Sequence, residues 1–172
     1  GFVHRFTKAE DLAALLTGAR DAILSYGSLE TCFRKNDPGG ETVISGLARF
    51  AGRIAREAHT HLLADPCKGS ACKRWHLYLR WMVRSDAVDP GCWGGVSPAR
   101  LVVPLDAHMW RICRGLGLTG YASPSRNSAL EATAAFREIC PSDPVRYDFA
   151  LMHASVNDDP DLARLIEERG RT

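Results

Sequence analysis

Apolar residues recur every three or four positions along most of the chain, which is the spacing of one face of an α-helix. The first such stretch begins near Thr7, where Glu10 three residues later predicts a capping box, and it continues to about Gly27. Its apolar positions are Leu12, Leu15, Leu16, Ala19, Ile23 and Leu24. A second helix is predicted from Thr42 to about Leu63, before Asp65-Pro66. Its inward positions are Val43, Ile44, Leu47, Phe50, Ile54 and Ala58.

The segment 70–84 predicts a third helix that is apolar on most sides and therefore central and buried. Glycine and proline in the following segment, 86–100, predict irregular chain. Four further helices are predicted at about 106–116, 128–139 and 145–156, and from 159 onward. Helical periods dominate and no convincing strand pair appears, so the fold class is all-α: a helical bundle, with two small helical lobes as the alternative.

Length and composition set the limits of this fold. A chain of 172 residues favours one domain over 1–172, or two small lobes that share a core. With 22 basic and 20 acidic residues the net charge is only +2, so any contact with DNA must come from a local patch. The first candidate patch holds Lys68, Lys73, Arg74, Arg80 and Arg84, and the second holds Arg111 and Arg114.

The six cysteines are spread along the chain, and no secretory signal precedes them, so we expect reduced thiols and a cytoplasmic protein. They are Cys32, Cys67, Cys72, Cys92, Cys113 and Cys140. No metal site is expected, because Cys67 and Cys72 lack a second pair and His59 and His61 face different ways. The apolar runs are too short to cross a bilayer, so no membrane contact is expected. The chain starts abruptly on a helical pattern, which suggests that an N-terminal part is missing.

Two short segments carry residues suited to chemistry on DNA. Gly69-Ser70-Ala71 is a run of small residues before a helix, where backbone N–H groups could bind a phosphate. Lys73 follows this turn, and its amine is a nucleophile when unprotonated. Asp106 begins a later helix. The simpler interpretations are a helix N-terminus capped by Ser70, a solvated lysine, and an aspartate that only caps its helix.

These segments resemble the helix-hairpin-helix DNA glycosylases. Residues 69–73 follow that superfamily's Gly-Val-Gly-Thr-Lys pattern, with alanine for the second glycine. Leu-Asp-Ala-His-Met-Trp-Arg at 105–111 is similar to its Val-Asp-Thr-His-Val-x-Arg. The resemblance implies that Lys73 is a nucleophile that forms a Schiff base and that Asp106 takes a proton or stabilises the sugar cation. It also implies a set of DNA-backbone contacts: Lys68, Gly69, Ser70, Ala71, Arg74 and Arg111.

The interval between Lys73 and Asp106 is longer than in most of the superfamily and is similar to that of the archaeal 8-oxoguanine glycosylases. This resemblance implies excision of a damaged base from double-stranded DNA, an oxidised purine such as 8-oxoguanine, with β-elimination as an added lyase step. It implies a monomer with no cofactor, and no iron–sulfur cluster, since only Cys113 and Cys140 follow Asp106. The residues expected to recognise the base are Trp93, Tyr147 and Asp148. Trp110 is a further candidate, and two other tryptophans, Trp75 and Trp81, are expected in the core.

Over most of its length the chain most closely resembles a family of uncharacterised bacterial proteins, the DUF2400 type. Three segments carry the shared sequence motifs. Residues 68–84 begin with Lys-Gly-Ser-Ala-x-Lys-Arg and end with Leu-Arg-Trp-Met-Val-Arg, and residues 97–108 begin with Ser-Pro-x-x-Leu and end with Pro-Leu-Asp-x-His. Residues 143–151 read Asp-Pro-Val-x-Tyr-Asp-Phe-Ala-Leu. Two other functions stay open. One is a catalytically silent nucleic-acid-binding module, and the other is a helical protein-interaction scaffold, which the near-neutral charge favours. A DNA-repair role would place the protein at the nucleoid.

Overall fold

The structure, a computed structural model, describes residues 3–4, 7–55 and 62–169. These residues form eight α-helices, two short 3-10 helices and two strands of two residues each, which confirms the all-α prediction. The chain divides into two compact units, residues 1–70 and 71–172, and each is described by itself.

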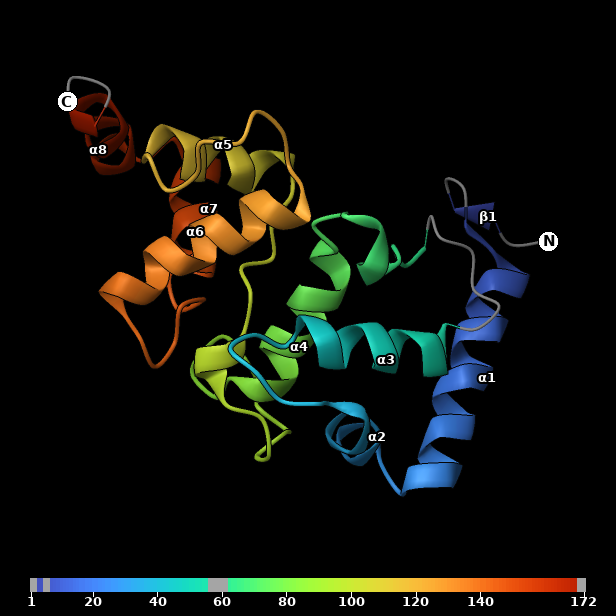
Figure 1. The fold of residues 1–172 in the computed structure, drawn as a ribbon. Helices are drawn as coiled ribbons and strands as arrows, with labels where there is room; N and C mark the ends of the chain where they lie inside the picture. The colour runs from blue at the N-terminus through green and yellow to red at the C-terminus, as the bar shows by residue number, and fades with distance from the viewer. Residues whose placement is uncertain (1–2, 5–6, 56–61, 170–172) are drawn as a thin grey trace. The chain divides into compact units, whose positions relative to one another are not determined.

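The first unit holds three helices that all contact one another: α1 (Ala9–Tyr26), α2 (Leu29–Asn36) and α3 (Ile44–Ile54) (Figure 1). A small hairpin of β1 (Val3–His4) and β2 (Thr7–Lys8) precedes them. The predicted capping box is wrong by one residue, because α1 is capped at Lys8, whose backbone N–H donates to Asp11. The α2 helix was not predicted; the hydroxyl of Ser28 caps it by accepting from the Thr31 N–H.

Aromatic and aliphatic side chains from α2 and α3 form the core of this unit. Phe33 and Phe50 are fully buried and meet edge to face, with ring centroids 5.6 Å apart. A side chain at Gly18 would clash with the carbonyl of Ile54, so this glycine lets α1 approach the end of α3. The second predicted helix corresponds to α3, and most of its inward positions are buried: Val43, Leu47, Phe50 and Ile54. Ala58, His59 and His61 lie outside the described residues.

The unit closes with a 3-10 helix, η1 (Pro66–Lys68). The second unit starts with α4 (Lys73–Val83), followed by irregular chain and a second 3-10 helix, η2 (Pro98–Arg100). Four helices complete it: α5 (Ala107–Gly115), α6 (Arg126–Ile139), α7 (Asp148–Val156) and α8 (Pro160–Arg169).

Helix α5 is the centre of the second unit, since α6, α7 and α8 all contact it (Figure 1). The approach of α8 is close, because a Cβ added at Gly115 would lie 3.0 Å from the side chain of Ile166. The chain reaches α5 through a buried extended run, residues 101–105. Within that run the Val103 N–H donates to the hydroxyl of Thr133 on α6 at 3.0 Å. This contact fixes the path of the chain just before Asp106.

The third predicted helix starts later than expected, at Lys73 rather than Ser70. The observed helix is also less uniformly buried than the sequence predicts. Trp75 lies in the core with 5% of its surface exposed, but Trp81 is 43% exposed, so the prediction of a core position is wrong for Trp81.

Candidate functional site

Lys73 and Asp106 meet in the second unit. Lys73 is the first residue of α4 and Asp106 immediately precedes α5, yet Nζ of Lys73 lies 2.5 Å from Oδ2 of Asp106. Both side chains are about one-third exposed, at 36% and 34%. The pair is therefore reachable from solvent while still partly shielded from it.

The α5 helix holds Asp106 in place through its own backbone. Oδ1 accepts hydrogen bonds from the N–H groups of His108 (3.0 Å) and Met109 (2.9 Å), which is the geometry of an N-cap. Oδ2 is thereby left for Lys73. Burial opposes the ionised form, but the hydrogen bonds from Lys73 and these two amides outweigh it and hold the pKa of the Asp106 carboxyl below its usual value. The site contains a carboxylate that stays ionised.

A strained turn places Lys73. Cys72, the N-cap of α4, is buried and has φ 47° and ψ 40°, in the left-handed region that residues with a Cβ rarely adopt. Gly69 is also left-handed, with φ 77°. The alternative in which Ser70 caps the helix is wrong, since Cys72 occupies that position. Ala71, which stands where the glycosylase pattern has its second glycine, does not have a positive φ.

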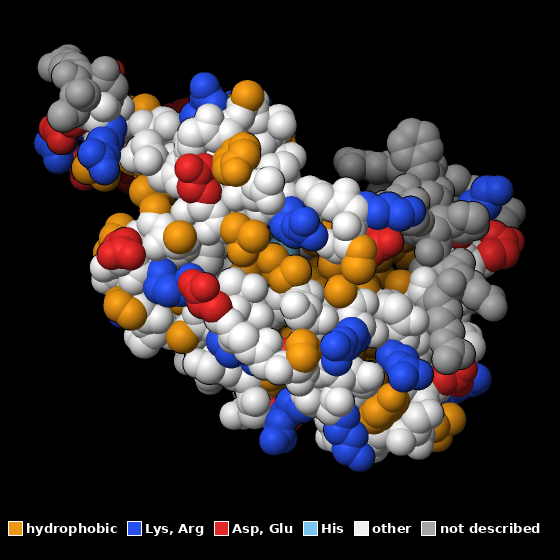
Figure 2. Space-filling model, viewed as in Figure 1, with side chains coloured by type: hydrophobic (Ala, Val, Ile, Leu, Met, Phe, Trp, Pro, Cys, Tyr) orange, Lys and Arg blue, Asp and Glu red, His pale blue; other side chains and the backbone are white. Residues whose placement is uncertain are grey.

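The residues expected to touch the DNA backbone are mostly accessible. Lys68, Gly69 and Ser70 are exposed at the end of the first unit, and Arg74 and Arg111 are exposed in the second. Ala71 is buried, so only its backbone could serve. On the face drawn in Figure 2, basic side chains are interspersed with acidic and apolar ones and do not form one continuous field.

Arg114 has local partners of its own. Its guanidinium donates to the carbonyl of Tyr121 at 2.9 Å and lies over the ring of Trp110, 5.7 Å from the centroid. The indole N–H of Trp110 donates to the same carbonyl at 3.0 Å. This arginine therefore holds the loop after α5 against the helix.

Two arginines of the predicted basic patch have a different role. Arg80 and Arg84 are only 3% and 7% exposed. With four aspartates they form what we call the arginine–aspartate cluster: Arg80, Arg84, Asp86, Asp89, Asp143 and Asp148. Assigning these two arginines to a DNA patch was wrong, because a buried, paired guanidinium cannot reach a phosphate. Asp86 and Asp89, close behind Arg84 in the sequence, were the signal that could have shown this.

Within this cluster Asp89 is the central acceptor, with a side chain that has no exposed surface. It accepts from Nη2 of Arg80 at 2.9 Å and also from Arg84. Arg80 donates in addition to Asp148, and Arg84 donates to Asp143 at 2.9 Å. The cluster ties α4 to the irregular segment and to the start of α7.

The three residues expected to recognise a base lie in different surroundings. Trp93 is 7% exposed and packs edge-on against Tyr78, with centroids 5.7 Å apart. Tyr147 packs beside Phe136, at 6.2 Å. Asp148 is buried and accepts a hydrogen bond from Arg80. Burial raises the pKa of the Asp148 carboxyl above its usual value, although the charge of Arg80 acts in the opposite direction.

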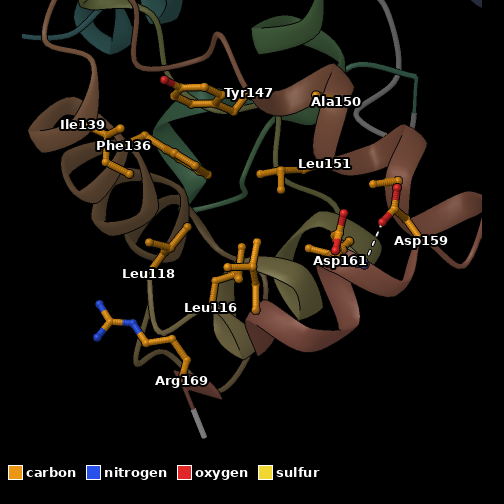
Figure 3. A pocket seen from close by; sticks show the side chains of 13 residues that line it. Leu116, Leu118, Phe136, Ile139, Tyr147, Ala150, Leu151, Asp159, Asp161 and Arg169 are labelled. Carbon is orange, nitrogen blue, oxygen red and sulfur yellow. Dashed lines mark hydrogen bonds between the residues drawn. The ribbon is translucent and has the colours of Figure 1, made fainter. Parts of the chain in front are cut away.

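Tyr147 belongs to an apolar pocket of about 660 Å³ between the end of α5 and helices α6, α7 and α8 (Figure 3). Figure 3 shows Phe136 and Leu151 facing this space, with Asp161 and Arg169 at its edges. Neither Lys73 nor Asp106 lines it. The full lining is Leu116, Leu118, Phe136, Ile139, Tyr147, Ala150, Leu151, Ala154, Asp159, Asp161, Leu162, Leu165 and Arg169.

Two histidines near the site were not given a chemical role from sequence. His108 joins α5 to α7, with Nε2 2.9 Å from the hydroxyl of Ser155. His76, one turn after Lys73, is 4% exposed, and its Nδ1 has no hydrogen-bond partner among the described residues. Burial lowers the pKa of His76 to about 4, so this imidazole is neutral at physiological pH.

No group of three or more His, Cys, Asp or Glu side chains in the described ranges is arranged to hold a metal ion. None of the helices described here is both long and apolar enough to cross a membrane.

Comparison with known proteins gives one family. No curated protein and no solved structure matches the chain. The model of a family described as a protein of unknown function, DUF2400, matches residues 1–157. This range includes the turn at residues 69–72, Lys73, Asp106 and the whole arginine–aspartate cluster. The chain is therefore a member of the DUF2400 family.

Proposed function

We propose that this protein is a DNA glycosylase in which Lys73 is the nucleophile and Asp106 its carboxylate partner. The observation that carries the proposal is the 2.5 Å contact between Nζ of Lys73 and Oδ2 of Asp106. These two residues stand at the two positions through which the sequence resembles the helix-hairpin-helix glycosylases. Their side chains come from different helices and are partly exposed, which suits a site that must admit a substrate.

In the proposed reaction the lone pair of the Lys73 amine forms a bond to C1′ of the damaged nucleotide. The glycosidic C1′–N bond breaks, and the base leaves with that electron pair and takes up a proton. Opening of the sugar ring then converts the adduct to a Schiff base. The ionised Asp106, held at the N-terminus of α5, stabilises the positive charge that develops on the sugar.

The exposed turn supplies the contacts to the DNA backbone in this proposal. Lys68, Arg74 and Arg111 are exposed cations, and the backbone of 69–71 is free of bulky side chains. An oxidised purine such as 8-oxoguanine is the proposed base. Trp93 is not proposed to stack on that base, because its ring is buried against Tyr78.

Borohydride trapping tests this function. Duplexes that carry 8-oxoguanine, uracil or an abasic site are incubated with the protein, and a Schiff base is reduced to a stable covalent complex. We expect a complex that disappears in Lys73→Gln and is strongly reduced in Asp106→Asn. Lys35→Gln, at an exposed lysine of α2, is the matched control and should trap normally. Trapping that survives in Lys73→Gln would refute the assignment.

The apolar pocket favours a second candidate, a helical protein-interaction scaffold. Two of its lining side chains are well exposed, Ile139 at 62% and Leu165 at 50%. A scaffold would bind no DNA even at low salt. A catalytically silent DNA-binding module would bind with a strong salt dependence, and its binding would not need the charge of Asp106.

A further inference from the structure

A row of side chains along α5 leads away from the pair of Lys73 and Asp106. Asp106, Trp110 and Arg114 follow one another at steps of four residues, and residues at this spacing lie on the same side of a helix. With a rise of about 1.5 Å per residue, Arg114 lies about 12 Å further along the axis than Asp106. The row therefore starts at the proposed site and ends at the loop between α5 and α6.

Hydrogen bonds fix this loop on both sides of Tyr121. The carbonyl of Tyr121 accepts from the indole N–H of Trp110 at 3.0 Å and from the guanidinium of Arg114 at 2.9 Å. Just before it in the chain, the N–H of Gly120 donates to the carboxylate of Glu131 on α6 at 3.0 Å. The backbone that carries Tyr121 is thereby anchored to both helices.

The side chain of Tyr121, in contrast, is accessible. It is 46% exposed, and its ring and hydroxyl make no ring contact or hydrogen bond with another residue that the structure describes. A tyrosine has few torsions, so on a fixed backbone it can bind a partner with little loss of entropy. Trp110, which the sequence suggested for base recognition, is less available, since its N–H is engaged and Arg114 lies over its ring.

The segment around this row carries positive charge alone. Residues 107–130 contain three arginines and no Asp or Glu, in a chain whose net charge is only +2. Arg111 and Arg114 are exposed, and Arg126 is half-buried. Phosphates attract a local group of cations, and bases stack on aromatic rings. A nucleic-acid strand is the partner whose charge and rings match this surface.

We propose that Tyr121 stacks on an unpaired base of the bound DNA strand, while the phosphates of that strand lie along Arg111 and Arg114. Bases inside a duplex are stacked on one another, so the ring can take only a base that has left its pair. This inference rests on the proposed function of Lys73 and Asp106, and it names the substrate class: DNA that is single-stranded beside the damaged nucleotide. A strand that advances at least about 3.4 Å per nucleotide passes along the row in no more than about four nucleotides.

Binding of fluorescently labelled oligonucleotides to the full chain, followed by anisotropy at low salt, tests this surface. Each protein variant is titrated with a single strand and with the matching duplex. Stacking of one base corresponds to about a 5- to 150-fold change in affinity, so in Tyr121→Ala the Kd for the single strand should rise at least about fivefold. The Kd for the duplex should change less than about twofold, because paired bases do not reach the ring.

The structure offers controls for folding and for the loss of a ring. The hydrogen bonds that anchor Tyr121 use its main chain, so Tyr121→Ala should leave the loop in place. Tyr121→Phe keeps the ring and should bind as the wild type does. Phe149→Ala removes a ring of similar exposure, 48%, from α7 and should also leave the affinity unchanged.

An unchanged single-strand affinity in Tyr121→Ala would overturn the inference, and so would an equal loss on the duplex or in Phe149→Ala. Absence of any DNA binding at low salt would overturn it as well and would favour a protein partner for this surface. Borohydride trapping on an abasic single strand is run in parallel. Binding that depends on Tyr121 without a trapped complex would sustain the stacking surface and refute the glycosylase function, whereas a trapped complex with unchanged affinity in Tyr121→Ala would do the reverse.

Discussion

Asp89 is the residue of the second unit whose charge we expect to matter most for stability. Its side chain is fully buried and accepts hydrogen bonds from both Arg80 and Arg84. The substitution Asp89→Asn keeps the size of the side chain, removes its charge and turns an N–H donor toward one of the guanidiniums. The two arginines would then share less negative charge in a site that water does not reach.

The size of the effect follows from the partners that remain. Arg84 keeps Asp143 and Asp86, with side chains 21% and 39% exposed, so its charge stays balanced near the surface. Arg80 keeps Asp148 as its one acidic partner among the residues that the structure describes. Breaking a buried ion pair by removing one partner costs about 3–5 kcal/mol. Because one of the two arginines remains well paired, we expect the lower end, about 3 kcal/mol.

Urea denaturation followed by tryptophan fluorescence measures this loss. All four tryptophans, at positions 75, 81, 93 and 110, lie in the second unit, so the signal reports on that unit. With a slope of about 1–3 kcal/mol per molar urea, the midpoint should fall by about 1–3 M. The control Asp143→Asn, at the more exposed pair, should cost no more than about 1 kcal/mol. A loss of unfolding free energy below about 1 kcal/mol for Asp89→Asn would refute the reasoning, because so small an effect would mean that the charge of Asp89 does not stabilise a buried arginine.

Three further substitutions test the turn, the approach to Asp106 and the buried histidine. Cys72→Val should lower the free energy of unfolding by about 1–2 kcal/mol, because a β-branched residue resists the left-handed conformation, whereas Cys72→Gly should cost less; urea midpoints compare the two. Thr133→Val keeps the shape but leaves the N–H of Val103 without its acceptor, and thermal unfolding should show a loss of about 1–3 kcal/mol. The pKa of His76 is lowered to about 4 in the folded state from 6.5, so its contribution to stability is present above pH 6.5 and is lost as the pH falls toward 4. His76→Leu should be less acid-sensitive than the wild type in urea titrations at pH 7, 6 and 5, and equal sensitivity would contradict the assignment.

The long helices and the Asp106 cap could be predicted because their signals are local. Helical periodicity marks α1, α3 and α6, and an aspartate before an apolar periodic run is a common N-cap. Asp106 occupies that position as expected. Helix α2 was missed because it spans only 8 residues, too few for a periodic pattern to stand out.

The surroundings of the site could not be read from local signals. Arg80 and Arg84 look like surface cations in the sequence, and Asp148 lies 68 positions from Arg80. Only the folded second unit brings these charges together, so their burial depends on tertiary packing. Trp93 was predicted to recognise the base because it lies in an irregular segment, but irregular chain can be as well packed as a helix, and Trp93 is buried.

Helix α8 has a practical consequence for anyone who expresses this protein. The family match ends at residue 157, so a fragment designed from that match would end there. Yet Leu162 of α8 is buried and Ile166 rests on Gly115. A fragment that ends at 157 would expose one wall of the apolar pocket, including Leu116 and Leu151, to solvent. Such a bare apolar surface promotes self-association, so a boundary drawn from the family match alone would favour aggregation during purification.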